Sequence, residues 1–135
     1  MVTGLIHGHR GLAYLLVLSS TVSVVLALVN ALQGSKPGLV KAGTVLGRRV
    51  EPALMGIVAL IGGGAWVAAG FPLATPYLWA GVLALVLQGA LVGMLTKPAL
   101  VRLADGDAEA RWRWVAAAVA NVVIVYGIFG VMQAN

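Results

Sequence analysis

Four long apolar segments, separated by short polar breaks, dominate the hydrophobic pattern of this chain. They cover residues 11–33, 52–71, 77–96 and 112–133. Each holds about 20 residues or more, and at 1.5 Å per residue such a helix crosses a hydrocarbon core of roughly 30 Å. The pattern therefore predicts an all-α protein: one membrane domain built as a bundle of four transmembrane helices.

Proline, glycine and charged residues mark the expected ends of these helices. Gly34 to Gly38 should stop the first helix, and Glu51-Pro52 should begin the second. Proline is well tolerated in a first helical turn, because its missing N–H has no partner there in any case. By this interpretation residues 34–51 and 97–111 are loops.

The basic residues are concentrated in those two loops. Eight of the nine lie in these loops or, for Arg113, two residues beyond the second, and only Arg10 lies elsewhere. The eight are Lys36, Lys41, Arg48, Arg49, Lys97, Arg102, Arg111 and Arg113. Because loops rich in Lys and Arg stay in the cytoplasm, we expect both loops to be cytoplasmic and both termini to lie outside. The expected location is the inner (plasma) membrane of a bacterium.

Composition supports a membrane protein and excludes several other classes. The chain is 61% hydrophobic and 10% charged, with a mean hydropathy of +0.99, which is far from the values of soluble domains. The net charge of +5 follows from the loops that orient the helices, so no nucleic-acid partner is expected. The chain has no cysteine, so disulfides and cysteine-ligated metals are excluded.

A short internal echo suggests a duplication. The segment at 36–41, Lys-Pro-Gly-Leu-Val-Lys, is followed 61 residues later by Lys-Pro-Ala-Leu-Val-Arg at 97–102. Two helical hairpins derived from one ancestor would explain the echo. Two basic loops drawn from the same limited set of residues would explain it equally well.

Small residues recur at helical spacing within the apolar segments. The glycines expected to pack helices are Gly62, Gly63, Gly64, Gly89 and Gly93. In lipid, such residues let helix backbones approach closely, so that van der Waals packing stabilises the contact. The chain has more of these positions than one bundle needs, which favours docking to other membrane subunits. A hetero-complex is preferred over a homodimer, because no helix shows one dominant symmetric seam.

Three polar side chains share one depth inside the predicted bundle. Ser23, Gln88 and Asn121 each lie about eight to ten residues from the cytoplasmic end of their helix. An amide in hydrocarbon is costly unless it is hydrogen-bonded, so we expect a clamp between helices. A polar pocket for a quinone head group or a small solute is the alternative. All four acids fall outside the predicted spans, so proton-coupled transport is not expected.

His7 and His9 are the only histidines, and they precede the predicted first helix. Imidazole binds haem iron and other metals, so these two residues are the candidates for a cofactor site. The alternative is that His9 and Arg10 anchor the helix at the interface. No residue set points to a resident metal ion, and no cofactor is expected under the main interpretation.

The stretch from Ile6 to Leu16, with its His-Gly-His-Arg sequence, resembles a loose group of bacterial four-span proteins described as cytochrome-b-like. That resemblance implies a four-helix membrane fold and, in the relatives, further histidines in the second and third helices. The corresponding regions here hold Glu51, Pro52 and Gln88 instead. If the relatives bind haem, this chain is expected to have lost that ability or never to have had it.

The sequence thus predicts a non-catalytic accessory or scaffold subunit of a larger membrane complex, expected in respiratory or photosynthetic energy conversion. It carries no recognisable catalytic group, so we do not expect an enzyme. The first alternative is a redox module that binds haem or quinone. The second is a small channel or carrier.

Overall fold

The four apolar segments form four long helices in the computed structural model, which describes residues 2–134. The first is α1 (Val2–Leu32). The second runs unbroken through α2 (Pro37–Val45), η1 (Leu46–Val50) and α3 (Glu51–Ala69). The third runs through α4 (Pro76–Leu91), η2 (Val92–Thr96) and α5 (Lys97–Ala104). The fourth consists of η3 (Ala108–Ala110) and α6 (Arg111–Ala134).

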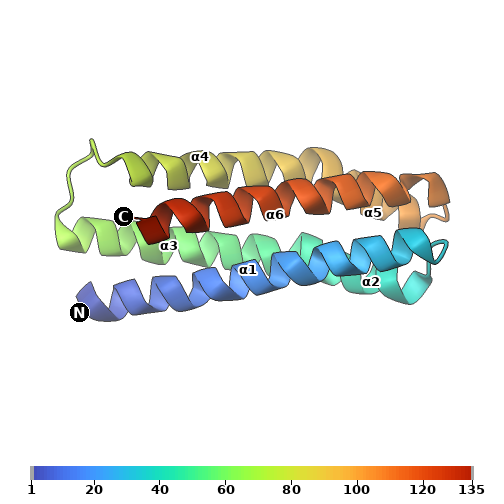
Figure 1. Cartoon of the computed structure of the whole chain (residues 1–135), viewed down its shortest axis with the longest axis horizontal. Coiled ribbons are helices and arrows are strands. Elements are labelled where there is room, and N and C mark those ends of the chain that lie inside the picture. The colour runs from blue at the N-terminus through green and yellow to red at the C-terminus, as the bar shows by residue number, and fades with distance from the viewer. Residues whose placement is uncertain (1, 135) are drawn as a thin grey trace.

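These helices lie side by side as a bundle, with both ends of the chain at the same end of it (Figure 1). Helix α1 packs against α3 and α6, and α4 packs against α6. Each of the four is long and apolar enough to cross a membrane. The predicted all-α bundle of four candidate membrane spans is therefore confirmed.

The two predicted loops are mostly helical. At the end of the bundle that carries α2 and α5, the breaks between α-helices are only residues 33–36 and 105–107, followed by the single 3-10 turn η3. The prediction of loops at 34–51 and 97–111 is therefore wrong over most of their length. The first helix also begins earlier than expected, at Val2, so that His7 and His9 lie within it.

Two prolines explain why the predicted loops are helical, because each proline lies inside a long helix instead of at its start. Pro52 follows the π-helical turn η1, and Pro98 follows the π-helical turn η2. In these turns the N–H of Glu51 donates to the carbonyl of Leu46, and that of Lys97 donates to Val92. A proline ring clashes with the carbonyl four residues earlier, and a π turn widens the helix at that point. The chain therefore continues through each proline without a break.

The two π turns share a motif that differs from the echo seen in the sequence. Residues 47–54 and 93–100 both follow the pattern Gly-x-x-x-x-Pro-Ala-Leu, and η1 and η2 are in contact. By contrast, the two copies of the echo stand in different settings, since Pro37 begins a helix and Pro98 lies within one. The motif at the π turns therefore relates the second helix to the third. This relation is closer than the one that the echo suggests between the two helical hairpins.

A cluster of buried hydrophobic residues lies at the end of the bundle that carries α2 and α5. It consists of Ala27, Val40, Ala99, Leu100, Leu103, Ala110, Trp114 and Ala118. Trp114 is only 1% exposed, and its ring occupies the space where a side chain on Gly43 would begin. Glycine at position 43 therefore lets α6 place a large aromatic ring against α2.

This contact predicts opposite effects for two glycines of α2. Gly43→Ala should lower the free energy of unfolding by about 1–3 kcal/mol, because Trp114 must move away from the new methyl group. Gly38→Ala is the matched control, since nothing lies within 4 Å of its Cβ position. It should leave stability unchanged or raise it by up to about 1 kcal/mol through helix propensity. Thermal unfolding in detergent measures both, and equal effects would contradict the packing described.

Candidate functional site

Glu51 lies inside the bundle, although its place before Pro52 suggested the edge of a loop. Its side chain is only 6% exposed. Because the second helix continues through Pro52, Glu51 occupies the interior of a helix of 33 residues that spans Pro37–Ala69. The expectation that all four acids lie outside the spans is therefore wrong for this one.

The carboxyl group of Glu51 joins the three polar residues predicted from the sequence. The Ser23 hydroxyl donates to Glu51 Oε1, and Asn121 Nδ2 donates to Glu51 Oε2 at 2.8 Å. Gln88 Nε2 donates in turn to Asn121 Oδ1 at 2.7 Å. We call these four side chains the polar centre: Ser23, Glu51, Gln88 and Asn121. Each of the four long helices supplies one of them.

The polar centre is closed to its surroundings and carries no internal cation. Ser23, Gln88 and Asn121 are each 5% exposed or less. The single ion pair of residues 2–134 joins Arg102 to Asp107, at one end of the bundle. Arg48 and Arg49, just before Glu51 in sequence, are exposed on the outside. The carboxyl group is thus held by neutral donors alone.

Along α1, the centre lies far from the nearest charged residues. Ser23 lies 13 residues from both Arg10 and Lys36, the nearest charged residues on either side in the sequence. At 1.5 Å per residue, 13 helical residues correspond to about 20 Å. Bulk water does not reach side chains as buried as these, so their partners come from the protein.

The two histidines do not come together. His9 Nδ1 lies 3.1 Å from the carbonyl oxygen of Val58, and its ring covers Gly62, 2.8 Å from where a Cβ would stand. His7 is exposed, with Nδ1 2.7 Å from the carbonyl oxygen of Thr3. Residues two apart on a helix face different directions, so one metal ion or haem cannot take both imidazoles. His9 instead fixes α1 against α3.

The predicted packing glycines separate into two groups. Gly62 makes room for His9 inside the bundle. For Gly63, Gly64, Gly89 and Gly93, no neighbouring atom among residues 2–134 lies within 4 Å of the Cβ position. Gly64, Gly89 and Gly93 are exposed, and Gly63 is half-buried. These four glycines therefore do not hold the bundle together.

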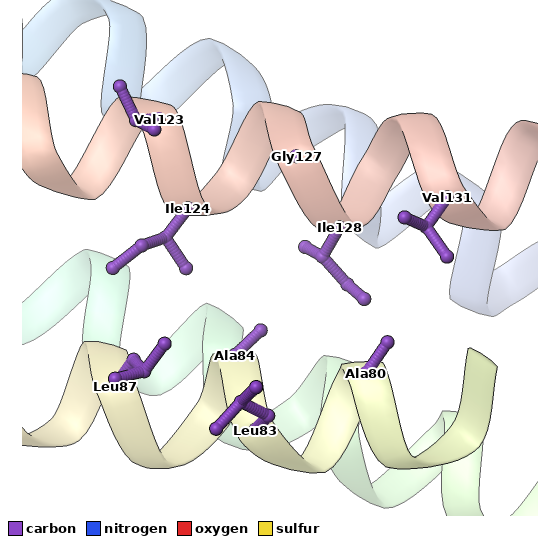
Figure 2. A pocket seen from close by; sticks show the side chains of 9 residues that line it. All are labelled: Ala80, Leu83, Ala84, Leu87, Val123, Ile124, Gly127, Ile128 and Val131. Carbon is purple, nitrogen blue, oxygen red and sulfur yellow. The ribbon is translucent and has the colours of Figure 1, made fainter. Parts of the chain in front are cut away.

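Two shallow apolar grooves mark the outer surface. One lies between α4 and α6, has a volume of about 200 Å³ and is lined by carbon atoms of small and branched residues such as Ala84, Leu87 and Ile124 (Figure 2). The other follows one face of α3 and includes Gly63 and Gly64. Neither groove is lined by a residue of the polar centre.

Comparisons with family models, with curated proteins and with solved structures give no match for this chain. The resemblance of residues 6–16 to cytochrome-b-like proteins therefore stays a prediction. Any functional assignment depends on the geometry of the chain's own side chains.

Sequence reasoning missed Glu51 because Pro52 was interpreted as the start of a helix. A usable signal was present: between Gly38 and Val50 most residues are small or apolar, as in a helix that continues. An acid directly before an internal proline could then have been counted as part of the span. It would have joined Ser23, Gln88 and Asn121 as a fourth polar position.

The polar centre predicts unequal costs for its two amides. Gln88→Leu removes one hydrogen bond and should cost roughly 0.6–2 kcal/mol of stability. Asn121→Leu removes two bonds and leaves Glu51 Oε2 buried without its donor, so it should cost more. The double variant should cost less than the sum, because the two changes share one bond. Thermal unfolding in detergent tests this, and strict additivity would show that the amides do not meet.

Proposed function

We propose that this chain is a non-catalytic subunit that docks other helices within a larger membrane complex. The observation that carries the proposal is the set of glycines left outside the bundle. Gly63 and Gly64 on the second helix, and Gly89 and Gly93 on the third, have no neighbouring atom within 4 Å of the Cβ position among residues 2–134. In lipid, a glycine surface is where another helix gains most from close approach.

The chain shows what such glycines do when they are occupied. Gly43 accepts the ring of Trp114, and Gly62 accepts the ring of His9. Gly89 and Gly93 lie one turn apart on the outer surface. Together they leave a similar small depression, which we call a notch, with no neighbouring atom within 4 Å of either Cβ position among residues 2–134. A helix from another polypeptide fits this position in the way α6 and α1 fit the two internal ones.

The polar centre supports a scaffold more than a site of chemistry. Its four side chains bond to one another, and both ends of the Asn121 amide are used. Such a network fixes the relative positions of all four helices. The haem alternative has less support, because His7 and His9 face different directions.

Docking through the third helix predicts that a bulky residue there releases partners. Gly93→Leu should remove co-purifying polypeptides from the protein extracted in mild detergent, while membrane insertion is unchanged. Gly11→Leu is the control: it is also exposed and without neighbours, but His7 and Leu15 flank it at one-turn spacing, so it offers no small-residue notch. Size-exclusion chromatography with mass spectrometry measures the loss. Recovery of the native protein as a particle of only 13.8 kDa plus detergent would contradict the proposal.

The proposed orientation has its own test. From the charge pattern we expect the turns at 33–36 and 105–107 in the cytoplasm and the turn at 70–75 outside. A reporter active only in the cytoplasm should give signal when fused after Ser35 or Gly106. It should be silent when fused after Thr75 or Asn135. The reverse pattern would overturn the orientation without affecting the docking proposal.

A further inference from the structure

A buried carboxyl group is more than a scaffold requires, since two amides could clamp the same helices without a group that ionises. We propose that Glu51 is a proton-exchange site, which gains and loses its proton through the hydroxyl groups of Ser19 and Ser23 on α1. The inference goes beyond the docking function and does not depend on it.

The surroundings of Glu51 favour a proton over a metal ion. Both carboxyl oxygens are already in direct contact with donors, Ser23 and Asn121, so a metal ion would have to break these bonds. An ionised carboxylate in an apolar interior is costly unless a positive charge accompanies it. A proton is the one cation that neutralises the group in place. Ionisable residues in membrane spans commonly mark proton or ion pathways.

The hydrogen bonds of the centre suit both states of the carboxyl group. When Glu51 is ionised, the Ser23 hydroxyl and Asn121 Nδ2 each donate to one oxygen. When it is protonated, its own O–H can donate to Ser23 Oγ, because a hydroxyl both donates and accepts. Asn121 keeps its bond to Oε2 in either state. The carboxyl group therefore keeps its contacts to Ser23 and Asn121 through the exchange.

Ser19 provides the next step of the route. It lies one turn from Ser23 on α1, toward the end of the bundle that carries the chain termini, and it is 8% exposed. Its Oγ is buried and has no hydrogen-bond partner among residues 2–134. Side chains four apart on a helix are about 5–6 Å apart at Cβ, a gap that one water molecule spans. Ser20, its buried neighbour, instead donates to the carbonyl of Val17 at 3.0 Å.

Among residues 2–134, no other ionisable side chain bonds to the centre. The charged or titratable side chains of the surrounding elements are His7, His9, Arg10 and Tyr14 on α1, Arg48 and Arg49 on η1, Tyr77 on α4, and Arg111, Arg113 and Tyr126 on α6. Tyr126 shares a hydrogen bond of 2.9 Å with Thr21, away from Glu51. A pH response of the centre therefore belongs to Glu51 itself.

The backbone at Glu51 departs from a regular α-helix. Glu51 follows the π turn η1 and precedes Pro52, which has no N–H for the helix ladder. Single π turns are frequent at functional sites in helices. In the loading step Ser23 gives its hydroxyl proton to the Glu51 carboxylate and is reprotonated through Ser19 by a hydronium ion, which becomes water. Release is the reverse step, and no oxidant or reductant takes part.

Carbon-13 NMR of the full chain in lipid nanodiscs tests the site directly. Glu51 and Glu109 are the only glutamates, so protein labelled with ¹³C at the glutamate carboxyl gives two signals. Glu109→Gln, at an exposed position, identifies them without disturbing the centre. The Glu51 signal should move between two limiting positions as pH changes. A position constant from mildly acidic to mildly alkaline pH would overturn the proposal, as would a shift that follows sodium concentration at fixed pH.

The route through α1 is tested with two neighbouring serines. After a rapid pH jump, the carboxyl infrared band of Glu51 should respond several-fold more slowly in Ser19→Ala than in the unchanged protein. Ser20→Ala is the matched control and should leave the rate unchanged, because its hydroxyl bonds within its own turn. Equal rates in both variants and the unchanged protein would exclude Ser19 from the route. Both measurements use the isolated chain, so they are independent of whether Gly93 docks a partner.

Discussion

In hydrocarbon, a polar group can bond only to the protein, and this constraint organises the bundle around Glu51. Its two carboxyl oxygens accept hydrogen bonds from Ser23 on α1 and Asn121 on α6. Asn121 in turn accepts a hydrogen bond from Gln88 on α4. Moving any of the four long helices would therefore leave a buried polar atom without a partner. The apolar surfaces around the centre could slide against one another at little cost, but the hydrogen bonds could not.

The two internal prolines determine where that constraint acts. A helix that began at Pro52 would have placed Glu51 in a loop among the basic residues, in contact with water. The π turn before Pro52 keeps the helix intact, and the side chain of Glu51 then faces the interior. The third helix contains the same arrangement at Pro98, and Gly47 lies next to Thr96 where the two π turns meet. The π turn before Pro52 is thus what allows Glu51 to take its place in the polar centre.

Glycine has two roles in this chain that the sequence alone does not separate. At Gly43 and Gly62 it makes space for an aromatic ring from another helix of the same bundle. At Gly89 and Gly93 it leaves open notches on the outside. The same physical effect applies inside the bundle and at the proposed docking surface: glycine lets two helices approach closely in lipid. A scaffold with a proton-exchange site at its centre would place a titratable group where all four helices meet.

The sequence by itself determined the membrane class, the four helices and the common depth of Ser23, Gln88 and Asn121, because hydropathy and spacing along a helix are local properties. It did not determine that residues 37–50 and 97–104 continue the helices, because a proline ends a helix in most settings and the π turns that accommodate it depend on neighbouring contacts. Only the tertiary structure showed that Glu51 faces inward, that His7 and His9 diverge, and which glycines are occupied. Each of these depends on the rotation of one helix against another, which packing decides and no single segment specifies.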